Sequence, residues 1–169
     1  MNQFHLRKVS IAKKHTQVWS AKIDSFDGYI FVTAEYNHGI PGALKNGIDY
    51  LYKEWNNKAA GFVGYGSAGG VRAVEQLRLV MAELQVADVR AQVAVSIITE
   101  FEDFRIFKPA SYQENLVNNM LDQVISWGRA LKLVRTQKWS IVEFLCKETK
   151  RERDRSSEIR FWIWQIAEG

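Results

Sequence analysis

The apolar residues of this chain fall into two patterns, short uninterrupted runs and helical spacings. An uninterrupted apolar run spans residues 28–33, and two further predicted strands span residues 60–65 and 92–98. The first is rich in β-branched and aromatic residues and follows the turn-like pair Asp27-Gly28. Runs of this kind predict strands of a parallel sheet, the first of them buried on both faces.

Helical spacings occupy the stretches before, between and after these runs. Pro41 suits the first turn of a helix, and Leu44, Ile48, Leu51, Tyr52 and Trp55 continue a stripe beyond it. Further helices are predicted over 70–84 and 112–134, the latter with an inward stripe of Leu116, Met120, Val124, Trp127, Leu131 and Val134. A helix before the first strand would face inward with Val9, Ala12, Thr16, Trp19 and Ile23. This alternation predicts an α/β fold with right-handed crossovers.

Two loops follow the first two predicted strands. The first reads Thr-Ala-Glu-Tyr-Asn-His-Gly-Ile-Pro-Gly-Ala-Leu-Lys-Asn-Gly-Ile-Asp over 33–49, and the second reads Gly-Tyr-Gly-Ser-Ala-Gly-Gly over 64–70. Each loop opens a helix, so both belong at the carboxyl edge of the sheet. Ligands of open α/β sheets bind at that edge.

The first loop resembles the signature of the NADPH-dependent FMN reductase family, T-P-E-Y-N-x-x-x-P-G-x-L-K-N-x-I-D. The second resembles the next loop of that family, S-Y-G-x-x-G-G. Ala34, Gly47 and Gly64 stand where the family usually has Pro, Ala and Ser. The resemblance covers about residues 11–135 and implies a flavodoxin-like three-layer fold with a parallel sheet.

The resemblance also implies that the family's opening strand and phosphate-binding loop are not in this sequence. We therefore expect a domain over 1–135 that is truncated at its N-terminus, with a charged and aromatic extension over 136–169. In the flavodoxin-like strand order, the strand at 28–33 would then lie at a bare edge. A bare apolar edge favours a homo-oligomer.

Composition narrows the remaining possibilities. The net charge of +4 arises from residues 1–24, where five Lys and Arg face a single acid. This is the solvated face of a helix, without the aromatic interleaving of a nucleic-acid site. The chain has a single cysteine, Cys146, which favours a reducing compartment such as the cytoplasm. It has no long apolar run and no leader, so we expect a cytoplasmic protein without membrane contact. No metal site is predicted, because His5, His15, His38 and Cys146 share no ligand spacing.

By resemblance, FMN is the cofactor, NAD(P)H the co-substrate, and a small molecule such as a quinone, azo compound, metal oxyanion or flavin the electron acceptor. The flavin ring would lie along Ala34, Glu35, Tyr36 and Asn37, with Tyr65, Gly66 and Ser67 on its other side. Donors of hydrogen bonds there would stabilise the negative charge that hydride transfer places on the ring. No side chain is expected to act as a catalytic acid or base.

Three alternatives remain open. Glu35 and Asn37 could cap the following helix instead. The second loop also satisfies G-x-G-x-x-G, the pattern of a nicotinamide-only Rossmann dehydrogenase, although Asp88 precedes the expected strand and Glu100 is too distant to hold a ribose. The third alternative is a non-catalytic interaction module that pairs with an intact relative through the open edge.

Overall fold

The computed structural model describes residues 13–136. Its elements in chain order are α2 (Lys14–Asp24), β1 (Gly28–Ala34), α3 (Gly42–Asp49), β2 (Lys58–Gly66), α4 (Val71–Glu83), β3 (Val86–Ser96), β4 (Phe101–Glu102), β5 (Ile106–Phe107) and α5 (Tyr112–Thr136). The predictions concerning His5, Val9, Ala12, Cys146 and all but the first residue of the extension over 136–169 fall outside the described residues.

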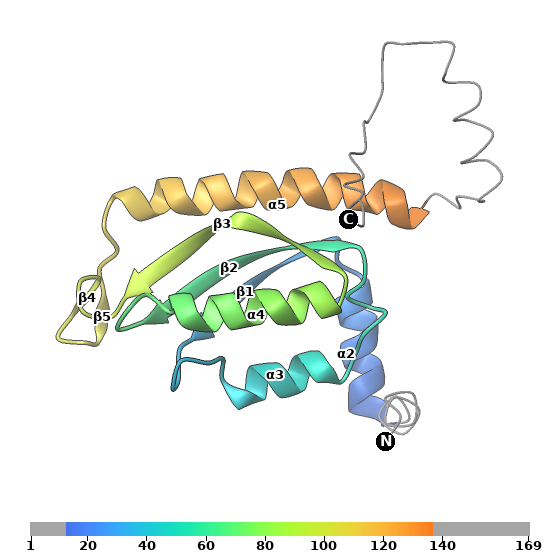
Figure 1. The fold of residues 1–169 in the computed structure, drawn as a ribbon, viewed down its shortest axis with the longest axis horizontal. Helices are drawn as coiled ribbons and strands as arrows, with labels where there is room; N and C mark the ends of the chain where they lie inside the picture. Colours follow the sequence, from blue (N-terminus) through green and yellow to red (C-terminus); the bar gives the residue numbers. More distant parts are fainter. Residues whose placement is uncertain (1–12, 137–169) are drawn as a thin grey trace, which may run out of the picture. The chain divides into compact units, whose positions relative to one another are not determined.

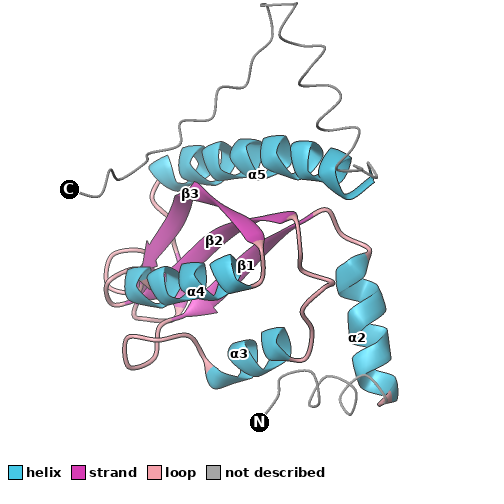
Figure 2. Cartoon of the chain, turned by 45° about the vertical axis from the view of Figure 1, so that its right-hand side comes forward, coloured by secondary structure: helices cyan, strands magenta, loops and turns pink. Residues whose placement is uncertain are grey.

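The central sheet has three parallel strands in the order β1-β2-β3. Helix α5 runs along one face, and α4 and α3 lie on the other (Figure 1). Two apolar clusters hold these layers together. The cluster under α3 and α4 includes Phe31, Trp55, Phe62 and Leu77. Met120 and Val124 of α5 belong to the cluster on the opposite face. The predicted flavodoxin-like α/β architecture is confirmed by this three-layer arrangement (Figure 2).

Helix α3 ends at Asp49, so Leu51, Tyr52 and Trp55 of the predicted helical stripe lie beyond it and are not helical. The first two strands and α4 begin and end close to the predicted residues. The third strand does not. It begins at Val86, six residues before the predicted start at Gln92, so Asp88 lies within β3 and not before it. A short antiparallel hairpin of β4 and β5 follows, and the apolar runs did not predict it.

Helix α5 faces the sheet with a different stripe from the one predicted. Met120 and Val124 are buried as expected, but Leu116, Trp127 and Val134 are exposed. Gln113 and Gly128 are buried in their place. The helix is rotated because a small residue at Gly128 lets it approach the carbonyl of Asp27, and because the Gln113 amide donates to the carbonyl of Ala94.

Strand β1 is not buried on both faces, which corrects the prediction made for it. Ile30 and Val32 are exposed, whereas Phe31 and Thr33 are buried. Among the described residues, β1 pairs with β2 on one side and with no strand on the other. Within residues 13–136, β1 is therefore an edge strand of the sheet.

Candidate functional site at the carboxyl edge of the sheet

The first loop is built around a tight two-residue turn. Tyr36 and Gly39 exchange both backbone hydrogen bonds, at 3.0 and 2.9 Å, and Asn37 and His38 between them have φ of 50° and 64°. This is the geometry of a type I′ turn, which requires positive φ at both central residues and favours Asn at the first. The turn therefore presents the exposed Asn37 side chain at its tip.

The second loop is closed by glycine. Gly70 has φ of 68°, and a Cβ on it would come within 2.6 Å of the backbone nitrogen of Tyr65. A Cβ on Gly64 would come within 2.8 Å of the carbonyl oxygen of Gly69. The loop thus folds back on the end of β2 with no room for a side chain. Gly64 stands where the family usually has Ser, so in this chain the backbone occupies the space of that side chain.

Glu35 joins the two loops. Its backbone N–H donates to the carbonyl of Tyr65 at 3.1 Å. Its carboxylate accepts from the backbone N–H of Arg72 at 3.0 Å and pairs with the guanidinium of Arg72. A second link runs from the Gln76 amide to the carbonyl of His38 at 2.7 Å. Both links lead from the first loop to α4, so the two loops form one unit at this edge of the sheet.

The Glu35 carboxylate acts as a cap for α4, which begins at Val71. Burial raises the pKa of this carboxyl, but hydrogen bonds from the Arg72 side chain and from the backbone N–H groups of Ala73 and Arg72 outweigh that effect, so the pKa lies below its ordinary value. A negative charge at this position is also favoured by the helix dipole. Glu35 thus caps a helix, but the alternative in which Glu35 and Asn37 cap the following helix is wrong, because α3 has no side-chain cap and the capped helix is α4.

This cap bears on the Rossmann alternative. A dinucleotide site places its pyrophosphate on the N-terminus of the helix after the glycine-rich loop. Here the backbone N–H groups of Arg72 and Ala73 already point to the Glu35 carboxylate, at 3.0 and 3.4 Å. The carboxylate of Asp88, the acid that might hold a ribose, already forms an ion pair with Arg78. The loop at 64–70 is therefore a poor phosphate site.

The structure places the predicted site residues as follows. Ala34 is buried as the last residue of β1, and Tyr36, Tyr65 and Ser67 are exposed around the loops. The N–H groups of Glu35 and Tyr36 are used within the chain. Among the described residues, the backbone N–H groups of Asn37, Ser67 and Ala68 have no acceptor, so they are among the donors that a ligand could meet. Arg72 and Gln76, which orient the first loop, were not predicted.

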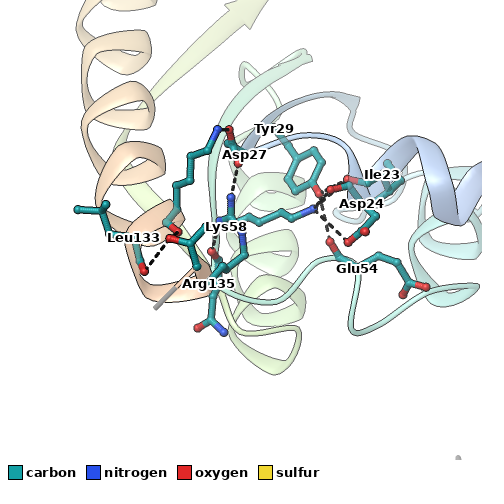
Figure 3. Close-up of polar contacts among 11 residues, drawn as sticks. Ile23, Asp24, Asp27, Tyr29, Glu54, Lys58, Leu133 and Arg135 are labelled. Carbon is teal, nitrogen blue, oxygen red and sulfur yellow. Dashed lines mark hydrogen bonds and ion pairs between the residues drawn. The ribbon is translucent and has the colours of Figure 1, made fainter. Parts of the chain in front are cut away.

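A second polar cluster lies at the opposite, amino edge of the sheet (Figure 3). The ammonium group of Lys58, whose residue is 2% exposed, donates to the carbonyls of Ile23 and Asp24, both at 3.0 Å. Tyr29 donates its hydroxyl to the same carbonyl of Ile23 at 2.9 Å. Burial lowers the pKa of Lys58 and raises that of Tyr29. The cluster caps the C-terminus of α2 and fixes that helix to the sheet, which is a structural role.

Asp27 belongs to the same edge and ties α5 to the start of β1. It pairs with Lys132 at 2.7 Å and also with Arg135, and Arg135 donates to the carbonyl of Asn57. The side-chain hydrogen bond from Lys132 is the largest cause that lowers the pKa of Asp27.

No helix among the described residues is long and apolar enough to cross a membrane.

Known proteins resemble this chain over part of its length. It is 54% identical over 65 residues to an NAD(P)H-dependent FMN reductase of Nectria sp., a match that covers 38% of this chain and 32% of the relative. It is 44% identical over 86 residues to an NAD(P)H-dependent FMN reductase of Saccharomyces cerevisiae, covering 51% of this chain and 44% of the relative. The matches thus span about a third to under half of the length of these relatives.

Solved structures support the fold. The flavoenzyme NAD(P)H:(acceptor) oxidoreductase FerB of Paracoccus denitrificans superposes with a TM-score of 0.53 at 18% identity, covering 72% of this chain and 69% of that one. The model of the NADPH-dependent FMN reductase family matches residues 3–100, which include both loops at the carboxyl edge. The chain is accordingly a member of the NADPH-dependent FMN reductase family.

Proposed function

We propose that the carboxyl edge of the sheet binds the ring of FMN and that the chain belongs to an NAD(P)H-dependent flavin oxidoreductase. The single observation that carries the proposal is the pair of loops that Glu35 joins into one unit. They carry the family's signature, and they leave the N–H groups of Asn37, Ser67 and Ala68 without acceptors. Unpaired donors on preorganised backbone suit a ligand with carbonyl and ring-nitrogen acceptors.

When bound, FMN would accept a hydride from NAD(P)H and pass two electrons to a small-molecule acceptor such as a quinone. The residues of this chain would bind and orient it. The Asn37 amide, at the tip of the type I′ turn, would donate to the ring edge on which negative charge develops. Gly64 and Gly70 would keep the second loop against β2, because neither position has room for a Cβ. The exposed Tyr36 and Tyr65 would flank the site as packing surfaces.

The described residues suit the ring of FMN better than its phosphate. The N-terminus of α4, the nearest helix end beside the second loop, is taken by Glu35. An incoming phosphate would meet that carboxylate and be repelled by it. We therefore expect the described loops to hold FMN mainly through its ring.

The experiment that tests the proposal measures NADPH oxidation by the purified chain with added FMN and a soluble naphthoquinone. NADPH and the quinone would use the same ring face in turn, so double-reciprocal plots should give parallel lines. Oxidation that does not depend on flavin, or intersecting lines, would contradict the scheme. Asn37→Gly is the informative variant, since it removes the amide and keeps a residue that tolerates φ of 50°.

The alternative of a non-catalytic interaction module predicts a different result. A module would bind no flavin and show no NADPH oxidation while still folding and associating through β1. We favour the enzyme because the loops at the carboxyl edge are bonded to each other and to α4, which an unused edge would not require. Cellular location and the identity of the acceptor remain predictions.

A further inference from the structure

The turn of the β4–β5 hairpin has a backbone conformation that its residues rarely adopt. The backbone N–H of Arg105 donates to the carbonyl of Glu102 at 3.0 Å, and Asp103 and Phe104 between them have φ of 51° and 55°. These are the positive φ values of a type I′ turn, in which glycine or asparagine normally occurs. A bulky residue at positive φ is an outlier, and backbone strain of this kind clusters at ligand-binding sites. The hairpin tip is therefore a candidate ligand site.

The aromatic ring at this tip is exposed and has no ring partner. Phe101 and Phe107 hold the stem of the hairpin together, with their ring centroids 5.1 Å apart. Phe104, in contrast, is 72% exposed and has no ring contact with residues of the range 13–136. The stem does not need this ring, which leaves its face open to a ligand. Nucleotide bases stack on exposed aromatic side chains of this kind.

Arg105, next to Phe104, carries a positive charge without an acidic partner. Its side chain is exposed and forms no ion pair or hydrogen bond within the part of the chain that the structure describes. Other Lys and Arg side chains near this edge each pair with an acid: Lys45 with Asp49, Arg72 with Glu35 and Lys108 with Glu102. The guanidinium of Arg105 is therefore available to an anion.

The hairpin lies at the same edge of the sheet as the two loops, beside the end of β3 (Figure 1). The backbone N–H of Ile97 donates to the carbonyl of Gly66 at 3.0 Å, and the hydroxyl of Ser96 donates to the carbonyl of Ser67 at 3.4 Å. These bonds tie the segment that leads to the hairpin to the second loop. Neighbouring strands lie about 4.8 Å apart, so the ends of β1 and β3 are about 10 Å apart. A dinucleotide that reaches a flavin ring at β1 and β2 can thus extend past β3 to the hairpin.

We infer that the hairpin tip binds the adenosine half of NADPH, with the adenine ring stacked on Phe104 and the 2′-phosphate bound by Arg105. The inference rests on the proposed function, in which NADPH delivers a hydride to the flavin at the neighbouring loops. A guanidinium donates two parallel hydrogen bonds to one phosphate group, which suits Arg to this role. NADH has a hydroxyl in place of the 2′-phosphate, so Arg105 would make the chain prefer NADPH.

The phosphate of FMN is the other phosphate that could reach Arg105. FMN has one aromatic ring system, and the proposed site holds that ring at the carboxyl ends of β1 and β2. Its phosphate would therefore use Arg105 and leave Phe104 exposed. An adenosine phosphate uses both side chains, which fits an exposed ring and an unpaired guanidinium at successive positions of one strained turn.

Calorimetric titration of the flavin-free full chain tests the adenosine site. Adenosine 2′,5′-bisphosphate should bind at least about tenfold more tightly than adenosine 5′-monophosphate, because Arg105 adds charge-assisted hydrogen bonds to the 2′-phosphate. Arg105→Gln should remove this difference, and Phe104→Leu should weaken the binding of both nucleotides. Arg129→Gln, at an exposed position of α5, is the matched control and should bind like the wild type. Equal affinities of the wild type for the two nucleotides, or an Arg105→Gln variant that keeps the preference, would overturn the inference.

A second titration separates the two phosphates and the two proposals. The affinity of the wild type and of Arg105→Gln for FMN is measured by flavin fluorescence, and it should be the same for both chains. A variant that loses affinity for FMN but keeps the nucleotide preference would assign Arg105 to the flavin phosphate and overturn the inference. Nucleotide preference without any flavin binding would support the adenosine site and contradict only the flavin site. Flavin binding without nucleotide preference would overturn only the adenosine site.

Discussion

Replacing Gly70 by alanine tests whether the second loop has the conformation described. Gly70 lies at φ of 68°, where an alanine costs about 1–2 kcal/mol. Its Cβ would also come within 2.6 Å of the nitrogen of Tyr65 and 2.8 Å of the carbonyl carbon of Gly64, both backbone atoms that cannot turn away. Overpacking of this kind costs about 1–3 kcal/mol more. Gly70→Ala should therefore lower the free energy of unfolding by roughly 2–5 kcal/mol.

The assay is urea unfolding followed by tryptophan fluorescence, with Gly47→Ala as the matched control. Gly47 lies inside α3, and a Cβ on it would meet nothing within 4 Å. Alanine there should raise the free energy of unfolding by about 0.5–1 kcal/mol, since glycine is a poor helix former. Equal effects of the two substitutions, or a Gly70→Ala variant as stable as the wild type, would refute the proposed loop conformation.

Further predictions concern the two ends of the site and the buried charges. Asn37→Gly should weaken flavin binding roughly tenfold, because one hydrogen bond is lost, and should leave the free energy of unfolding unchanged. Asn37→Ala should weaken flavin binding and also lower the free energy of unfolding, because alanine is strained in the turn. Equal stability of both variants would contradict the type I′ assignment. The dissociation constant of riboflavin should lie within about tenfold of that of FMN, because Glu35 occupies the helix end where a phosphate would gain charge-assisted bonds. Quenching of flavin fluorescence measures both constants, and a large preference for FMN would show a phosphate site elsewhere. Stability should fall in acid as pH drops from the ordinary Glu value through the lowered pKa of Glu35, and Glu35→Gln should lose this part of the acid dependence in urea titrations. Lys58 has the same sign in alkali, because its folded pKa lies below 10.5, so the unfolded chain binds more protons in that interval and stability rises with pH. This slope is best measured against Lys58→Met in a Tyr29→Phe background, since the raised pKa of Tyr29 acts in the other direction.

The sequence was sufficient to predict the features that depend on local pattern. Uninterrupted apolar runs marked β1 and β2, and the glycines and the Asn-containing segment marked the loops that follow them. These signals are local because strand burial, turn geometry and helix starts each depend on a few neighbouring residues. The position of both loops at one edge then followed from the parallel topology.

Features that depend on distant partners were not predictable in the same way. The capping of α4 by Glu35 joins residues 37 positions apart, and nothing near Glu35 in the sequence indicates its partner Arg72. The inward face of α5 was misassigned because Gln113 and Gly128 are buried there in place of larger apolar residues. The start of β3 was missed because the segment 86–91 mixes apolar residues with Asp88 and Arg90.

Chemical-shift mapping with FMN tests the central claim most directly. A ¹⁵N-labelled sample of the full chain is titrated with FMN, and the shifts of the backbone amides are followed by residue. The largest shifts should fall on Asn37, Ser67 and Ala68, with little change at Lys58 on the opposite edge of the sheet. Shifts concentrated at the amino edge, or no shifts at millimolar FMN, would contradict a flavin site at the carboxyl ends of β1 and β2.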